Sequence, residues 1–168
     1  GLRRQRAKTL ALLFFEEGPE TAVLNPFYLS LVGSMVRRCA AHGYDLLISI
    51  QQLSSDWHGD YEDSRKADGI ILLGYGDYLE YRPKLEQLVA RGAHFVRWGT
   101  GGDGQLGMTV SSDNERGGFE AATHLLQQGR RRIAFIGTAG PGFPEVQERW
   151  HGYRRALRAA GIAPDERL

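Results

Sequence analysis

The stretch DGIILLG at residues 68–74 decides the fold class, because its apolar residues follow one another without alternating with polar ones. A strand with one face in water alternates, whereas a strand covered on both faces stays apolar. Five further stretches share this apolar character and are also predicted to be strands: TLALLFF at 9–15, YDLLIS at 44–49, HFVRWG at 94–99, MTVS at 108–111 and RIAFIG at 132–137. The pattern favours a parallel sheet between two layers of helices.

Segments with helical periodicity lie between these strands. The helices are expected at 27–42, 83–91, 115–128 and about 146–160. Pro83 suits a first helical turn, and Gly117 with Gly118 is expected to let its helix pack closely on the sheet. The alternation of strand and helix predicts an α/β fold, a doubly wound parallel sheet in three α/β/α layers, with its ligand site beyond the carboxyl ends of the strands.

Composition excludes several classes of protein. The 168 residues are 42% hydrophobic and 24% charged, which is neither a disordered nor a membrane-inserted composition. The net charge of +1 gives no electrostatic reason to expect nucleic acid on this chain. The single cysteine, Cys39, lies on an apolar helical stripe and is expected in the core rather than as a nucleophile. No spacing of histidines, carboxylates or nucleophiles indicates a metal, a cofactor or a catalytic site, so the chain is predicted not to be an enzyme.

Two glycine-rich loops raise a nucleotide-binding alternative. GTGGDG at 99–104 is followed by a predicted strand, so no helix amino terminus is available there for a phosphate. GTAGPG at 137–142 does precede a helix, but it lacks the Lys-Ser/Thr of a P-loop and the Rossmann glycine spacing. A flexible turn is the favoured interpretation, and a nucleotide-using enzyme built on 137–142 stays open as an alternative.

Two charged residues are candidates for ligand binding. Asp113 or Asn114, in SSDNERGG at 111–118, would cap the following helix, and a carboxylate at this strand end could also accept hydrogen bonds from ligand hydroxyls. Arg149, in ERWHGY, lies near the positive end of the last helix dipole, an unfavourable position for a cation. Its guanidinium could donate a planar pair of hydrogen bonds to a ligand, although a solvated arginine is the simpler alternative.

Aromatic residues follow the same strand ends. Phe27 and Tyr28, in NPFYLSL at 25–31, are adjacent at a helix start, so one can pack in the core while the other offers its face to a sugar or a heterocycle. Trp98 ends the strand of VRWG and has the same two interpretations.

In order and spacing these segments resemble the effector-binding core of LacI/GalR-type bacterial transcription regulators, which is related to type I periplasmic binding proteins. The strongest part of the resemblance is the series DNERGG, HLLQQGRRRIAFIG and RWHGYRRAL between residues 113 and 157. The resemblance implies a ligand cleft between two lobes. By position it implies an effector site made of Asp113, Arg149, Asn25, Phe27, Tyr28, Tyr75, Asp77 and Trp98.

The resemblance also implies an organisation and a function. Residues 1–8 are expected to be a linker remnant, 9–129 the first lobe and 130–168 the beginning of an incomplete second lobe. The parent protein is expected to be a cytoplasmic regulator that senses a small sugar or derivative. It would bind operator DNA through a helix-turn-helix absent from this chain, and would form a homodimer through surfaces such as the 27–42 helix. A solute-binding protein of a sugar transport system is the alternative.

Overall fold

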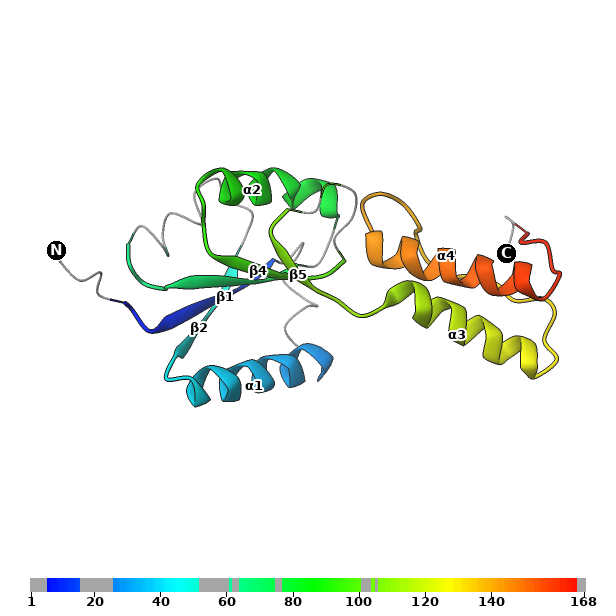
Figure 1. Cartoon of the computed structure of the whole chain (residues 1–168), viewed down its shortest axis with the longest axis horizontal. Coiled ribbons are helices and arrows are strands. Elements are labelled where there is room, and N and C mark those ends of the chain that lie inside the picture. The colour runs from blue at the N-terminus through cyan, green and yellow to red at the C-terminus, as the bar shows by residue number, and fades with distance from the viewer. Residues whose placement is uncertain are drawn as a thin grey trace.

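A computed structural model describes residues 6–15, 26–51, 61, 64–74, 77–100, 104 and 106–165 (Figure 1). In these parts the chain forms, in order, β1 (Thr9–Phe15), α1 (Pro26–Ala41), β2 (Asp45–Gln51), β3 (Gly69–Gly74), α2 (Tyr78–Ala90), β4 (Phe95–Trp98), β5 (Met108–Val110), α3 (Asn114–Gln127) and α4 (Pro144–Ala159). The candidate site residues Asn25 and Tyr75 lie outside the described residues.

The sheet has the strand order β2-β1-β3-β4-β5, and every neighbouring pair is parallel. In the register, Leu12 of β1 is opposite Ile48 of β2 on one side and Ile71 of β3 on the other. The predicted parallel sheet is thus confirmed for five of the apolar stretches. Because all strands run the same way, their carboxyl ends meet at one edge, where the following loops can build a shared site.

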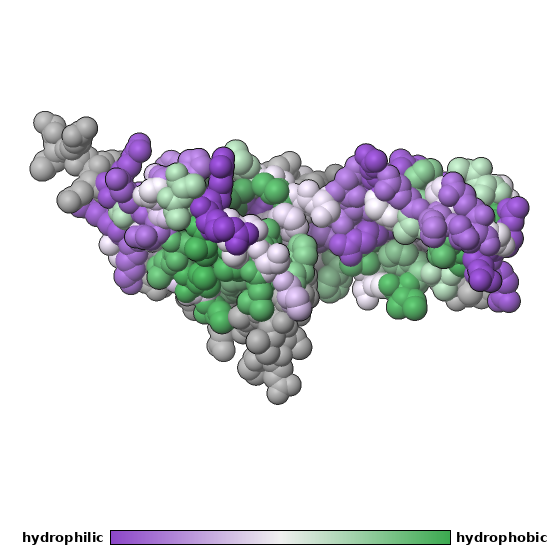
Figure 2. Space-filling model, turned by 90° about the horizontal axis from the view of Figure 1, so that it is seen from below, coloured by the Kyte–Doolittle hydropathy of each residue, from purple (hydrophilic) through white to green (hydrophobic). Residues whose placement is uncertain are grey.

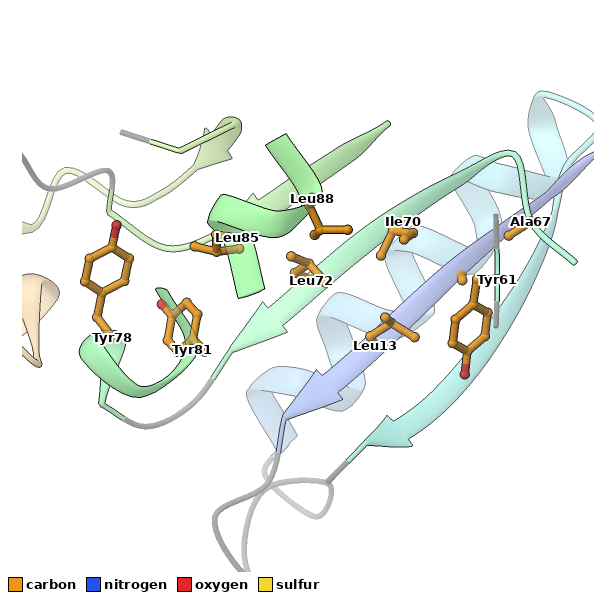
Figure 3. Packing of buried hydrophobic residues seen from close by; sticks show 10 residues of the cluster. Leu13, Tyr61, Ala67, Ile70, Leu72, Tyr78, Tyr81, Leu85 and Leu88 are labelled. Carbon is orange, nitrogen blue, oxygen red and sulfur yellow. The ribbon is translucent and has the colours of Figure 1, made fainter. Parts of the chain in front are cut away.

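Helices cover both faces of the sheet, with α2 above it and α1 below it in Figure 1. Successive side chains of a strand point to opposite faces. Leu13 packs with Leu72 and Leu85 on the α2 face (Figure 3), whereas Leu12 packs with Tyr28 on the α1 face. Each buried leucine contributes about 1.5–3 kcal/mol. The three-layer prediction is confirmed, and the non-alternating apolar runs follow from burial of both faces of the central strands.

Cys39 lies buried in α1, as expected for a core residue, and burial raises the pKa of its thiol. Because the neutral thiol is the form that burial favours, Cys39 is a poor nucleophile. The described helices include none long and apolar enough to cross a lipid bilayer.

The prediction of a strand at 132–137 was wrong. A strand needs a hydrogen-bonded neighbour, and none of the five described strands lies beside this segment. Its contacts are instead with α4: Ile133 is buried against Tyr153, whose hydroxyl donates to the Ile133 carbonyl at 2.7 Å. Ile136, on the same segment, is 97% exposed.

The start of α2 was also misplaced. The helix begins at Tyr78 rather than at Pro83, because the Asp77 carboxylate caps it by accepting the Leu79 N–H at 2.8 Å. Pro83 therefore lies inside the helix, not in its first turn.

The expectation that Gly117 and Gly118 pack α3 on the sheet was wrong as well. The two helices α3 and α4 pack against each other beyond the end of the sheet (Figure 1). A Cβ on Gly118 would collide with the backbone carbonyl of Arg149, and one on Gly152 would collide with that of Glu115, whereas Gly117 faces open space. The glycines therefore allow helix-to-helix rather than helix-to-sheet contact.

Candidate functional site

Asp113 follows β5 and caps α3, as one of the two sequence alternatives predicted. Its carboxylate accepts the Arg116 N–H at 3.0 Å. The residue is exposed at the sheet edge where the strands end. The capping role is confirmed, and one carboxylate oxygen with further lone pairs remains for other donors, since an ionised carboxylate accepts several hydrogen bonds.

Arg149 lies in the second turn of α4, and its Nε donates to Asn114 Oδ1 at 2.8 Å. Asn114 is the neighbour of Asp113 and is 5% exposed. The structure therefore brings the two charged candidates, 36 positions apart, to the same corner of the molecule. The side chain of Arg149 is exposed overall, so its guanidinium is accessible to a ligand.

The aromatic candidates form one cluster. Tyr28 is 4% exposed and packs in the core, whereas Phe27 is 52% exposed, so the prediction that one packs and the other is accessible is confirmed. The Phe27 ring lies 5.1 Å from that of Tyr28, edge to face, and 6.1 Å from that of Trp98. An accessible aromatic face at this strand edge is suited to the apolar face of a sugar ring.

Asp77, the remaining described candidate, serves first as the cap of α2. It lies against the 137–142 loop: a Cβ on Gly142 would collide with the Asp77 carboxylate, and the neighbouring Tyr78 N–H donates to the Gly142 carbonyl at 2.7 Å. This loop is thus bound to the start of α2 through its backbone.

A buried polar cluster, missed by the sequence interpretation, joins these elements. Its centre is Thr100, just after β4, which is 5% exposed. The Thr100 N–H donates to Glu145 Oε1 at 2.7 Å, and its hydroxyl donates to Glu148 Oε2 at 2.9 Å. The Nδ2 group of Asn114 donates to the Thr100 hydroxyl at 3.2 Å. Two carboxylates of α4 are therefore bonded to Thr100, at the end of β4.

The buried side chain of Arg97 stabilises this cluster through hydrogen bonds. Its side chain is 1% exposed, and it donates to the Thr100 carbonyl at 2.9 Å and to the Tyr81 hydroxyl at 3.2 Å, with its guanidinium 5.2 Å from the centre of the Tyr78 ring. Burial raises the pKa of Tyr81 although the nearby Arg97 charge opposes it, so the phenol stays protonated at neutral pH. The one available signal was a charged residue between Val96 and Trp98 in an otherwise apolar strand.

A hollow of about 390 Å³ lies elsewhere, between α4 and the segment after α3. It is lined by Phe135, Gly137, Ala139, Trp150, Tyr153, Arg154, Pro164 and Asp165. None of the candidate residues lines it, so it is separate from the site described above. In the described part of the chain no group of three or more histidine, cysteine or acidic residues is placed to hold a metal ion.

Comparison with known protein families shows the family to which this chain belongs. Residues 19–167 match the family of periplasmic binding proteins and sugar binding domains of the LacI family. The chain belongs to this family. The LacI-family assignment confirms the resemblance and the fold class derived from the sequence.

Individual relatives of this LacI-family chain are transcription regulators. The HTH-type transcriptional regulator CelR of Thermobifida fusca is 30% identical over 169 residues, which cover 98% of this chain and 48% of CelR. The HTH-type transcriptional repressor CytR of Escherichia coli K12 is 29% identical over 152 residues, 85% of this chain and 42% of CytR. The chain thus spans about half the length of these relatives.

A solved structure of a relative supports the same family assignment. The structure of a CelR–cellobiose complex superposes with a TM-score of 0.78 at 29% identity and covers 98% of this chain and 50% of its own. CelR and CytR are both transcription regulators.

Proposed function

We propose that this chain is the effector-binding part of a LacI-type transcription regulator, and that its effector is a small sugar or sugar derivative. The observation that supports the proposal is that β4 and β5 end side by side in a chain of this family: Trp98, with Phe27 beside it, ends β4, and Asp113, whose neighbour Asn114 binds Arg149, follows β5. The CelR structure with cellobiose supports a sugar as ligand class.

Each group has a chemical role in this proposal. The Asp113 carboxylate accepts hydrogen bonds from sugar hydroxyls, and the Arg149 guanidinium donates to hydroxyl or carboxylate oxygens. Phe27 and Trp98 cover an apolar sugar face. By the family resemblance, Asn25, Tyr75 and Asp77 are proposed to contribute further contacts to the effector. No group here is asked to break a bond, which accords with a sensor rather than an enzyme.

In this proposal, effector binding regulates the protein by changing the equilibrium between arrangements of its lobes. A ligand that binds one arrangement of the lobes more tightly than another shifts the population toward that arrangement. Residues 9–129 would form the first lobe and residues from 130 onward would begin the second. The whole protein, acting in the cytoplasm, would transmit the shift to operator DNA through a helix-turn-helix in the remainder of the regulator.

The whole protein is proposed to be a homodimer that pairs through its first lobe. Leu29 and Val36, seven residues apart on α1, are exposed on one face of that helix, and Ile48 and Ile50 of β2 are exposed beside it in the same lobe. Figure 2 shows apolar side chains gathered on this side of the molecule. Val36→Asp is expected to dissociate the dimer in analytical ultracentrifugation, and an unchanged sedimentation coefficient would exclude α1 from the interface.

The site is tested by isothermal titration of the full-length protein with cellobiose. Asp113→Asn keeps a helix cap because asparagine caps as well as aspartate, so a loss of affinity reports on the carboxylate itself. Arg149→Ala is matched by Arg158→Ala, an exposed arginine at the other end of α4. We expect Asp113→Asn and Arg149→Ala each to weaken binding about tenfold or more, as for a lost charged hydrogen bond, and Arg158→Ala to leave it unchanged.

The transport alternative is separated by a DNA readout. If the full-length protein selects a specific DNA duplex from a random pool, and if sugar changes its affinity for that duplex, the result supports a transcription regulator. Sugar binding with no selected duplex would support a solute-binding protein. The curated relatives, which are regulators, favour the first outcome.

A further inference from the structure

We propose that Asn114 and Thr100 are positioning residues that hold the Arg149 guanidinium in its binding orientation. The inference rests on the proposed function in one respect only, namely that Arg149 contacts the effector. The orientation itself is a property of the protein without ligand.

The Asn114 side chain can take only one orientation in this site. Its Nδ2 lies 3.2 Å from Thr100 Oγ1, 3.3 Å from Ser111 Oγ and 3.1 Å from the Ser112 carbonyl, all of which can accept a hydrogen bond. Its Oδ1 faces Arg149 Nε, which can only donate. A flipped amide would set N–H groups against the guanidinium, so the network fixes which atom faces Arg149.

The hydrogen bonds form a chain of one polarity. Arg149 donates to Asn114, Asn114 donates to Thr100, and the Thr100 hydroxyl donates to the Glu148 carboxylate, which can only accept. The chain therefore begins at a cation and ends at an anion. Bonds aligned in this way polarise and strengthen one another in a poorly solvated place.

Thr100 is itself held in place by its backbone. Its N–H is bonded to Glu145 and its carbonyl to Arg97, a side chain that is 1% exposed. Gly99 makes this possible: with φ of +132° it takes a conformation that L side chains rarely adopt. A Cβ there would lie 2.8 Å from Glu145 Oε1 and 3.2 Å from an Arg97 nitrogen.

The arrangement leaves Arg149 prepared for a ligand. The bond to Asn114 uses Nε, so the two terminal nitrogens, which carry four of the five guanidinium N–H groups, can be directed at ligand oxygens. A free arginine side chain loses several rotatable bonds on binding. Here part of that ordering exists beforehand, which raises affinity.

The first test needs no sugar. In nitrogen-15 NMR of the full-length protein, exchange of the Arg149 Nε proton with water reports on its hydrogen bond. Thr100→Val, which removes the hydroxyl, is expected to speed this exchange about tenfold, as for a tenfold less populated bonded state, and Thr100→Ser to restore it. Arg116 Nε, bonded to Glu120 at 2.7 Å on the exposed face of α3, is the internal control and should not change.

The second test measures affinity for cellobiose in a double-mutant cycle. Thr100→Val should weaken binding about tenfold when Arg149 is present and should have no further effect in an Arg149→Ala background. Glu148→Ala, which removes the acceptor at the end of the chain, provides a second variant with the same expected pattern if Thr100→Val does not fold.

The outcomes are distinguishable. Unchanged Arg149 Nε exchange in folded Thr100→Val and Glu148→Ala overturns the positioning role. Equal loss of affinity in both backgrounds also overturns it, because the effect would then not pass through Arg149. If Thr100→Val frees the Arg149 proton while Arg149→Ala binds cellobiose like the wild type, the positioning is upheld and the proposed effector role of Arg149 fails.

Discussion

Gly118 of α3 and Arg149 of α4 meet backbone to backbone. The carbonyl of Arg149 occupies the space that a Cβ of Gly118 would need, and Gly152 has the same relation to Glu115 on the opposite helix. The two helices therefore touch through paired glycines. This close approach places the start of α4, with its carboxylates and its arginine, beside the start of α3.

Two neighbouring glycines test this contact. Gly118→Ala is expected to lower the free energy of unfolding by about 2–3 kcal/mol, because the helices must separate to admit the methyl group. Gly117→Ala, which faces open space in the same helix, should instead raise it by up to about 1 kcal/mol through helix propensity. Urea denaturation measures both, and equal effects of the two substitutions would contradict the packing.

Arg97 is predicted to be the most costly arginine to truncate. Arg97→Ala removes two buried hydrogen bonds, one to the Tyr81 hydroxyl and one to the Thr100 carbonyl, and should lower the free energy of unfolding by about 3–5 kcal/mol. Arg82→Ala removes an exposed ion pair with Glu86 at 3.0 Å and should cost about 0.5 kcal/mol or less. Similar small losses for both would show that the buried cluster contributes little.

Substitutions of the adjacent aromatics Tyr28 and Phe27 are expected to have different effects, one on the stability of the fold and the other on ligand binding. Tyr28→Ala removes a core side chain and is expected to cost about 3 kcal/mol in the free energy of unfolding. Phe27→Ala loses only partly exposed ring contacts, about 1 kcal/mol or less, yet should weaken cellobiose binding. The pair is compared by denaturation and calorimetry. A Phe27→Ala protein with wild-type affinity would remove Phe27 from the site.

Alkaline pH is predicted to destabilise the fold. Burial raises the pKa of the Cys39 thiol and of the Tyr81 phenol. In the unfolded chain these groups have their ordinary pKa values of about 8.5 for cysteine and 10 for tyrosine, so the unfolded state releases the two protons at a lower pH than the folded state does. The stabilisation is therefore complete below about pH 8 and is lost progressively above it. Denaturation midpoints between pH 7 and pH 10.5 check this expectation. Cys39→Ala should flatten the lower part of the curve, and an unchanged slope would show that another group titrates.

The sheet could be predicted because burial on both faces of a strand leaves a direct record in the sequence. DGIILLG and TLALLFF are apolar at every central position, and both strands are central in the sheet. RIAFIG is similarly apolar but forms no strand here, because pairing depends on a neighbouring strand that composition does not specify. Pro83 is compatible with a first helical turn and so suggested a later start for α2, but the helix starts five residues earlier because Asp77 caps it.

The candidate site was only partly predictable, for a similar reason. Asp113 follows β5, so topology directs it to the edge where the strands end, whereas Arg149 reaches the same corner only through the packing of α4 against α3. Thr100 and Glu145 are 45 positions apart, and no local spacing indicates that an N–H after β4 meets a carboxylate in the first turn of α4. Which of Phe27 and Tyr28 packs depends on how α1 is rotated on the sheet, which two adjacent aromatics leave undetermined.

The attachment of α4 through Glu148 and Arg149 has a mechanical consequence. Adjacent helical residues project about 100° apart, and here one is bonded to Thr100 while the other reaches Asn114. A helix held in two directions around its axis cannot rotate freely, so the rotation of α4 is coupled to Thr100, after β4, and to Asn114, at the start of α3. Any rotation of α4 about its axis must break one of these hydrogen bonds or move the residues that follow β4 and β5 with it.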